Sequence, residues 1–253
     1  MEEKYIETPH LPKNTIKCAL VDYRIGEKTV KVLEDQGISL IKTVACAELY
    51  QAIEGHPDMV IQHLGGRDIL IAPNVIQYYQ PKFEALGFRV LEGKTYLKGN
   101  YPHDIAYNIC RIGSHVIHNF KHTDKALLDD LQKRNLVKIH VSQGYSKCSV
   151  AVVDKKAMIT SDSGIHKEVI KFGIDSLLIA KGGILLPGVN HGFIGGACGY
   201  LDQETLGFYG DITSHESFEK IAFFLRKYNK KIKCLNNKKL QDYGTLIPLL
   251  EMG

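Results

Sequence analysis

The chain has 253 residues, 44% of them hydrophobic, with a formal net charge of +4 at pH 7 and a pI near 8.6. This hydrophobic content is enough for a buried core, and so mild a positive charge does not require a polyanionic partner. The six cysteines show no C-x-x-C pair, and there is neither a signal-peptide pattern nor a run of 18 apolar residues, so we expect a reduced, cytoplasmic protein outside the membrane.

The first elements follow a polar beginning. Residues 1–14 contain two prolines and are predicted to form an arm rather than a helix or strand. Residues 16–22 (IKCALVD) predict a strand, and residues 27–35 a short helix that Gly37 ends. Residues 38–53 predict a strand followed by a second short helix.

Two later segments share one layout and predict β-hairpins. Residues 101–119 (YPHDIAYNICRIGSHVIHN) have two apolar runs joined by a glycine-containing turn, and residues 55–74 (GHPDMVIQHLGGRDILIAPN) repeat this arrangement. Each has an aspartate before its first apolar run, and Asp104 follows Asp58 by 46 positions. A fixed period in this range is typical of a repeat architecture.

The repeat continues to the end of the chain. Residues 141–154 (VSQGYSKCSVAVVD) align without a gap with residues 189–202 (VNHGFIGGACGYLD), 48 positions later. A fifth unit needs both ends of the chain, with one strand from residues 240–251 and its partner from residues 16–22. This pairing would close a ring and leave no exposed sheet edge at the join. We therefore predict one domain over residues 1–253, an α/β propeller of five pseudo-symmetric hairpin-helix-strand repeats.

The segments between the hairpins carry helical patterns. Residues 74–86 show an apolar stripe interrupted by Pro81, and Thr123 is placed to cap the next helix. A third helix is expected from Gly164 to Phe172. The clearest pattern follows a possible capping box formed by Thr213 and Glu216.

In a closed ring of repeats, the positions at the start of each hairpin converge near the pseudo-rotation axis. The alignment places there Asp58, Asp104, Cys148, Gly196 and Gly244. The neighbours expected to flank them are His56, His103, Asn108 and Lys147. Two nearby carboxylates repel each other unless a cation lies between them, so the cleft predicts a positively charged ligand or a raised pKa on one acid. The alternative is that each aspartate is only a turn residue bonded to a nearby backbone N–H.

This layout resembles the pentein fold of guanidino-group-modifying enzymes, which include arginine and agmatine deiminases, dimethylargininases and amidinotransferases. HPDMVI at 56–61 resembles the first-unit R-D-P segment of that superfamily, and YPHDIAYN at 101–108 resembles its second-unit E-G-G-D segment. The acids of those segments hold the substrate guanidinium. The resemblance therefore implies an axial cleft that binds a small guanidino or amine compound through Asp58 and Asp104.

The chain departs from the superfamily at the reactive positions. The third unit of those enzymes carries H-L-D with a general acid/base histidine, where Ser146-Lys147-Cys148 stands here. Their fifth unit carries a nucleophilic cysteine that QDYGTLIP at 241–248 lacks, and the second-unit glutamate is replaced in the region of Tyr101 and Pro102. The resemblance thus implies a bacterial branch without the usual Cys/His pair, and the usual reaction does not transfer to these positions.

A relocated nucleophile remains open. Cys198 could act with His191 or His103 as its base, although it also fits a small apolar strand residue. Cys148 is closer to the predicted axis, and the adjacent Lys147 would lower its pKa unless the two side chains face opposite sides of a strand. If the protein is active, we expect a C–N hydrolase or an amidinotransferase-like enzyme.

We expect no metal and no cofactor. Five histidines show no H-x-x-x-H or H-E-x-x-H spacing among themselves, namely His56, His103, His115, His118 and His191. The glycine-rich segment 182–188 lacks the lysine of a phosphate loop. The lysine-rich segment 227–239 fits a solvated helix end and loop, but it would be the contact in a rival class of function, that of a ribosome- or RNA-associated pentein.

Overall fold

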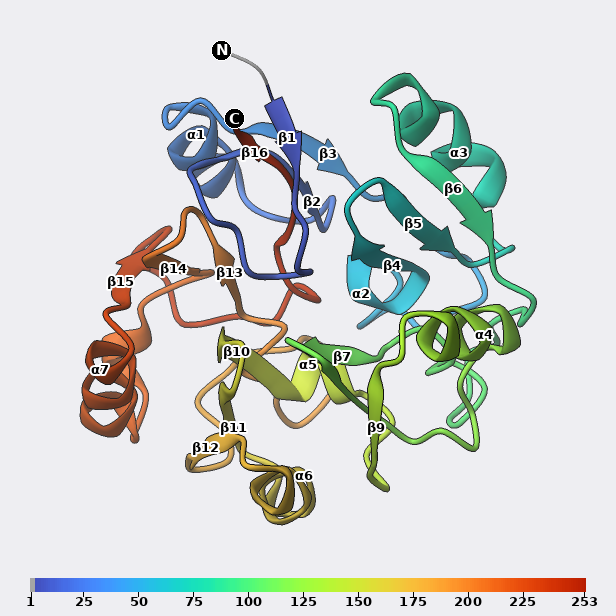
Figure 1. Ribbon diagram of the computed structural model, residues 1–253. Helices are drawn as coiled ribbons and strands as arrows, with labels where there is room; N and C mark the ends of the chain where they lie inside the picture. Colours follow the sequence, from blue (N-terminus) through green and yellow to red (C-terminus); the bar gives the residue numbers. More distant parts are fainter. Residues whose placement is uncertain (1–2) are drawn as a thin grey trace.

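The computed structural model describes residues 3–253 and shows five short sheets around a common centre, with the longer helices on the outside (Figure 1). In four sheets an antiparallel hairpin is followed by a third strand, which pairs in parallel with the second strand of that hairpin. These four blades comprise β4 (Ile61–Gly65), β5 (Asp68–Ile71) and β6 (Arg89–Glu92); β7 (Cys110–Ile112), β8 (His115–His118) and β9 (Val137–His140); β10 (Val150–Asp154), β11 (Ala157–Thr160) and β12 (Asp175–Leu178); and β13 (Cys198–Tyr200), β14 (Thr205–Phe208) and β15 (Lys231–Cys234).

The fifth blade joins the two ends of the chain. Strand β16 (Ile247–Met252) pairs antiparallel with β2 (Ile16–Val21), which pairs in parallel with β3 (Ser39–Lys42). The predicted closure of the ring is therefore confirmed. Strand β1 (Glu3–Tyr5) pairs with the other side of β16, so the expectation of an unstructured arm is wrong for these residues. Strand β1 thus forms hydrogen bonds with backbone groups of β16 that would otherwise be exposed at a sheet edge. Residues 1–2 of the predicted arm lie outside the described chain.

One helix connects the second and third strands of each blade, as parallel pairing requires. These helices are α1 (Glu27–Glu34), α3 (Ile76–Ala85), α4 (Lys125–Lys133), α6 (Ser163–Val169) and α7 (Phe218–Lys227), and α6 continues into the 3-10 turn η1 (Ile170–Phe172). They lie at the periphery of the ring (Figure 1).

Three local expectations were wrong. Asp124, rather than Thr123, caps α4, because its carboxylate accepts hydrogen bonds from the backbone of Ala126 and Leu127. The expected capping box instead contributes to the 3-10 turn η2 (Ile212–Ser214), which ends before α7 begins. Residues 45–53 form turns rather than a helix, since Cys46 N donates to Glu54 O and folds the segment back on itself.

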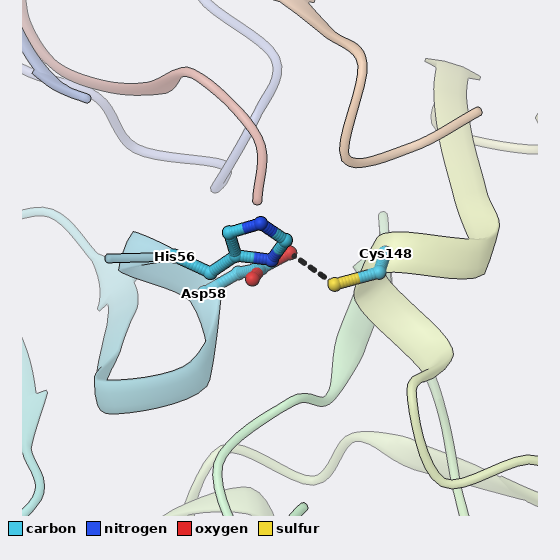
Figure 2. A group of neighbouring side chains, drawn as sticks. All are labelled: His56, Asp58 and Cys148. Carbon is cyan, nitrogen blue, oxygen red and sulfur yellow. Dashed lines mark hydrogen bonds between the residues drawn. The ribbon is translucent and has the colours of Figure 1, made fainter. Parts of the chain in front are cut away.

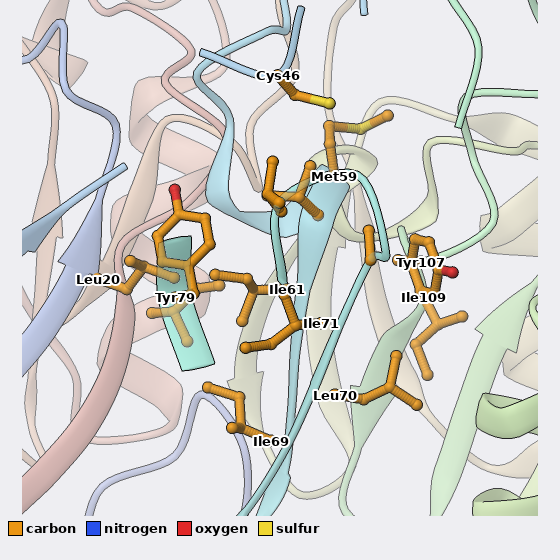
Figure 3. Close-up of a cluster of buried hydrophobic side chains, with 14 of the residues drawn as sticks. Leu20, Cys46, Met59, Ile61, Ile69, Leu70, Ile71, Tyr79, Tyr107 and Ile109 are labelled. Carbon is orange, nitrogen blue, oxygen red and sulfur yellow. The ribbon is translucent and has the colours of Figure 1, made fainter. Parts of the chain in front are cut away.

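The hairpins form the interior of the ring. Strands β4 and β5 are buried along their whole length, whereas the outer strand β6 has exposed residues at both ends and half-buried residues between them. Figure 3 shows the side chains of Ile61, Ile69 and Ile71 in a cluster of buried apolar residues. Burying each such side chain contributes about 1.5–3 kcal/mol, so the hairpins hold the centre of the ring rigidly.

Two one-turn helices lie near the centre. Helix α2 (Pro57–Val60) directly precedes β4, and α5 (Ser146–Ser149) directly precedes β10 (Figure 1). All of their residues are buried, including the polar ones. These turns therefore place polar side chains at the axis of the ring. Among residues 3–253, no helix combines the length and apolar character that a bilayer crossing requires.

Candidate functional site

Side chains from the first three blades meet at the axis. The thiol of Cys148 on α5 donates a hydrogen bond to Asp58 Oδ2 on α2 over 3.0 Å (Figure 2). Asn108 Nδ2, from the segment before β7, lies 3.3 Å from Cys148 Sγ and 3.1 Å from the backbone carbonyl oxygen of Asp58. The structure thus brings together Asp58 and Cys148, which the sequence predicted at the axis, and Asn108, which it predicted beside them.

A buried lysine connects this group to the other two blades. Lys147 is 2% exposed, and its Nζ donates to Thr245 Oγ1 at 2.9 Å and to two backbone carbonyls, those of Val150 and Gly195, at 3.3 Å. The Thr245 hydroxyl lies 3.1 Å from Asp58 Oδ2. Thr245 has a φ of +78°, which is costly for a β-branched residue and is tolerated only where the surrounding contacts enforce it.

This arrangement decides how Lys147 and Cys148 interact. The lysine turns toward Thr245, and burial, followed by the charges of Asp58 and Asp242, raises the pKa of the Cys148 thiol well above its usual value. The expectation that Lys147 lowers the pKa of Cys148 is therefore wrong. The alternative, that the two side chains face opposite sides of a strand, does not apply either, because both residues lie on helix α5. Cys148 is a protonated thiol in this structure.

Asp242 is a site residue that sequence reasoning missed. Its carboxylate accepts hydrogen bonds from the backbone N–H groups of Phe193, at 2.8 Å, and Gly244, at 2.9 Å. Burial raises its pKa to about 7. Its position two residues before Gly244, in the unit assigned to the axis, was the signal that could have identified it.

Two glycines make room for these groups, as the alignment predicted. A Cβ atom on Gly196 would lie 1.9 Å from Asp242 Oδ1. A Cβ atom on Gly244 would lie 2.3 Å from the Cβ atom of His56. Any larger residue at either position would displace the axial side chains.

His56 is fully buried beside the carboxylates. Neither of its ring nitrogens has a hydrogen-bond partner within residues 3–253, and Asp58 Oδ1 also lacks one. The Nε2 atom of His56 lies 3.9 Å from Asp242 Oδ1. Burial lowers the pKa of His56 to about 3 and raises that of Asp58 to about 6, with the charge of Lys147 limiting the rise. His56 is therefore neutral at pH 7.

A cleft of about 540 Å³ reaches this cluster from the surface. Its lining includes Arg24, Tyr50, Glu54, Leu186, Asp242 and Tyr243. Asp242 thus belongs both to the cleft and to the buried cluster. The Arg24 guanidinium is already bound to both carboxylate oxygens of Asp22 and to the carbonyls of Gln51 and Ala52.

Asp104 shares no hydrogen bond with the cluster of Asp58, Asn108 and Cys148. It is buried, and its Oδ2 accepts a hydrogen bond from Tyr145 Oη at 2.5 Å. Burial raises its pKa. No hydrogen bond joins Asp104 to Asp58, and Asn108 occupies the axial position of the second blade. The neighbouring His103 is exposed on a turn.

The structure does not bring Cys198 and His191 together. Cys198 is buried in a small cavity beside Lys147 and Thr245, and burial raises its pKa to about 12. His191 lines a separate cavity, and its Nδ1 lies 3.2 Å from Gly192 O. A catalytic dyad of these two residues has no geometric support here.

Two other sequence features have structural partners. His118 and His122 do have H-x-x-x-H spacing, but both ring nitrogens of His118 are engaged, with Thr123 Oγ1 and with Gly144 O. In the lysine-rich segment 227–239, three of the six lysines contact blades three and four: Lys227 contacts Asp175, Lys230 contacts Gln203 O, and Lys231 contacts Glu204. A ribosomal or RNA contact there stays a prediction.

A family model described as "Family of unknown function (DUF6873)" matches residues 20–247. The chain belongs to this family. The matched range contains all the axial residues described above, from His56 to Thr245. No curated protein matches the chain.

Solved structures match over most of the chain. The amidinotransferase SxtG from Microseira wollei, in the saxitoxin biosynthetic pathway, is 10% identical with a TM-score of 0.61, and the match covers 98% of both chains. An inosamine-phosphate amidinotransferase from Streptomyces griseus gives the same values. A mutant DDAH from Pseudomonas aeruginosa in complex with citrulline is 10% identical with a TM-score of 0.53, and the match covers 87% of this chain and 92% of that one. At these identities the comparisons establish the fold, which is the pentein α/β propeller.

Proposed function

We propose that the axial cleft of this DUF6873 chain binds a small guanidino or amine cation. The observation that carries the proposal is the position of Asp242, a buried residue that lines the 540 Å³ cleft and whose carboxylate lies beside His56 in the buried cluster. Burial raises the pKa of Asp242 to about 7, and a cation within about 4–6 Å would favour its ionised form. Binding of a positive group in the cleft is therefore favourable.

The walls of the cleft suit such a ligand. Tyr50 and Tyr243 offer aromatic faces that attract cations, and Glu54 adds a second acid at the mouth. Arg24 would repel a cation, but Asp22 offsets its charge. One N–H of the Arg24 guanidinium is not used in the hydrogen bonds described, so a ligand carboxylate would have a donor there.

The expected anchors take different roles in this proposal. Asp58 lies behind the cleft and contributes negative charge through the cluster rather than by lining the cavity wall. Asp104 positions Tyr145, whose ring packs near those of Tyr101 and Phe193. Asp242 replaces them as the residue that contacts the ligand.

A thermal-shift experiment in the presence of EDTA tests the proposal. Agmatine, arginine and citrulline are compared, because agmatine lacks the carboxylate and citrulline lacks the positive side-chain group. At a ligand concentration 100 times Kd we expect about 2.7 kcal/mol of stabilisation, or roughly 5–10 °C in Tm.

Asp242→Asn should abolish the shift, whereas the control Asp175→Asn, on the outer strand β12, should keep it. A larger shift with arginine than with agmatine would assign the ligand carboxylate to Arg24. No shift with any cation, or an equal shift in Asp242→Asn, would refute the proposal.

A second candidate is a Cys148-dependent C–N hydrolase, favoured by the hydrogen bond from the thiol to Asp58. As the sulfur forms a bond to the guanidinium carbon, its proton would pass to Asp58 and then to the leaving amine as the C–N bond breaks; water would then hydrolyse the S–C bond. Cys148 is 2% exposed, so this reaction needs an opening of the cleft floor.

Ammonia release from agmatine or arginine that is lost in Cys148→Ser but kept in Cys198→Ser would support this second candidate. Labelling with iodoacetamide gives an independent readout. In the folded protein we expect the exposed Cys234 to react first and Cys148 only slowly, because burial both covers it and raises its pKa. Rapid labelling of Cys148 would show that the floor opens readily.

A further inference from the structure

Three different metal-ligand types converge at the axis. The ligand atoms of His56, Asp58 and Cys148 all lie within 4.8 Å of one another, and all three residues are buried (Figure 2). Both nitrogens of His56 and Asp58 Oδ1 lack hydrogen-bond partners within residues 3–253. A buried polar atom without a partner costs about 1–3 kcal/mol, so unpartnered atoms on two neighbouring buried side chains indicate a missing ligand.

The donor set favours a transition metal. An imidazole nitrogen, a carboxylate oxygen and a thiolate sulfur are the ligands of zinc sites, with metal bonds of about 2.0–2.3 Å. Tetrahedral bonds of this length separate ligand atoms by about 3.3–3.7 Å. Binding would therefore spread Cys148 Sγ and Asp58 Oδ2, now 3.0 Å apart, and bring the more distant ligand atoms, within 4.8 Å, closer together. Asp242 Oδ1, 3.9 Å from His56 Nε2, is available as a fourth ligand.

We propose that His56, Asp58 and Cys148 bind a divalent transition metal ion, best matched by zinc, with Asp242 as the fourth ligand. This proposal goes beyond cation binding in the cleft, because it concerns a buried site with a thiolate ligand. Binding of the ion would displace the thiol proton that Cys148 now donates to Asp58 Oδ2, and would give partners to the unpartnered Asp58 Oδ1 and to one ring nitrogen of His56.

The surroundings already orient the ligands. Asn108 contacts both Cys148 Sγ and the backbone of Asp58, which is the role of an outer-shell residue in metal sites. The positive charge of Lys147 opposes a metal ion, but its hydrogen bonds run to Thr245 and to two carbonyls rather than into the cluster. Asp242, at the cleft, gives the ion a path to the interior.

Metal titration of protein stripped with EDTA and then dialysed tests the proposal, in the absence of any amine. We expect one zinc ion per chain and, with cobalt, an intense thiolate-to-cobalt absorption band in the near ultraviolet. Cys148→Ser should remove this band and weaken zinc binding by more than about tenfold, whereas Cys18→Ser, which changes another buried cysteine on β2, should keep both. A wild-type cobalt complex without the band, or a band that persists in Cys148→Ser, would overturn the proposal.

A measurement on the unmodified protein guards against a variant that fails to fold. Zinc-edge X-ray absorption should show one sulfur at about 2.3 Å together with nitrogen and oxygen at about 2.0–2.2 Å. A coordination shell without sulfur would contradict the assignment. The thermal-shift experiment with amines contains EDTA, and the metal titration contains no amine. Either proposal can therefore fail without affecting the test of the other.

Discussion

Replacing Asp242 with asparagine should change how stability depends on pH. Burial raises the pKa of Asp242 from 3.8 to about 7, so between these values the folded protein retains a proton that the unfolded chain has released. The stability linked to this group is fully present below pH 3.8 and is lost as the pH rises through 7. At about 1.36 kcal/mol for each pKa unit, the difference amounts to about 4 kcal/mol.

Urea unfolding of both proteins from about pH 4 to pH 8, in EDTA, measures this effect. The free energy of unfolding of the wild type, relative to Asp242→Asn, should fall by about 4 kcal/mol across the range at constant m. Groups that titrate in both proteins and lie far from Asp242 largely cancel in this difference.

Asp175→Asn is the matched control. Lys227 lowers the pKa of Asp175, so the stability linked to this acid is present above pH 3.8 and is lost as the pH falls, opposite in sign to that of Asp242. The effect should also be small, because Asp175 is exposed and screened by solvent. A stability difference between wild type and Asp242→Asn that does not change between pH 5 and pH 8 would refute the reasoning about the buried carboxylate.

Two further comparisons test the packing of the axis and a buried hydrogen bond beside it. Gly244 and Gly173 have nearly equal φ values, +70° and +71°, but an added Cβ atom would clash only at Gly244. Gly173→Ala should therefore lower the free energy of unfolding by about 1–2 kcal/mol, and Gly244→Ala should lower it by about 1–3 kcal/mol more. Equal losses in urea unfolding would show that the axis is not tightly packed. Tyr145→Phe removes the hydrogen bond to the buried Asp104 and should cost about 1.5–3 kcal/mol, whereas a cost near zero would mean that water replaces the hydroxyl.

The closed ring could be predicted because the same local sequence pattern recurs in each repeat. Two apolar runs, a turn between them and a following helix recur at a nearly constant period. This pattern predicted the hairpins and the pairing of β16 with β2. Periodicity could not reveal β1, because Glu3–Tyr5 is too short to show a pattern and is defined only by its partner.

The site was predicted less completely because the segment before the first strand differs between blades. A one-turn helix precedes the first strand of blades one and three, whereas turns precede β7 in blade two. An alignment with a fixed period therefore placed Asp104 at the axis, where the structure has Asn108. A smaller offset, of two residues, separated Gly244 from Asp242. Partner geometry, such as the direction of the Lys147 side chain, follows from tertiary packing and leaves no pattern in the sequence.

We propose above all that the buried carboxylates at the axis, and Asp242 in particular, bind a cation that enters through the cleft. Carbon-13 NMR of the aspartate carboxyl groups, assigned with Asp242→Asn, tests it most directly by following titration with and without agmatine. Our account predicts that Asp242 titrates near pH 7 in the free protein and that saturating agmatine moves its pKa downward. An Asp242 carboxyl that titrates near 3.8 in the free protein, or a pKa that agmatine leaves unchanged, would contradict the account.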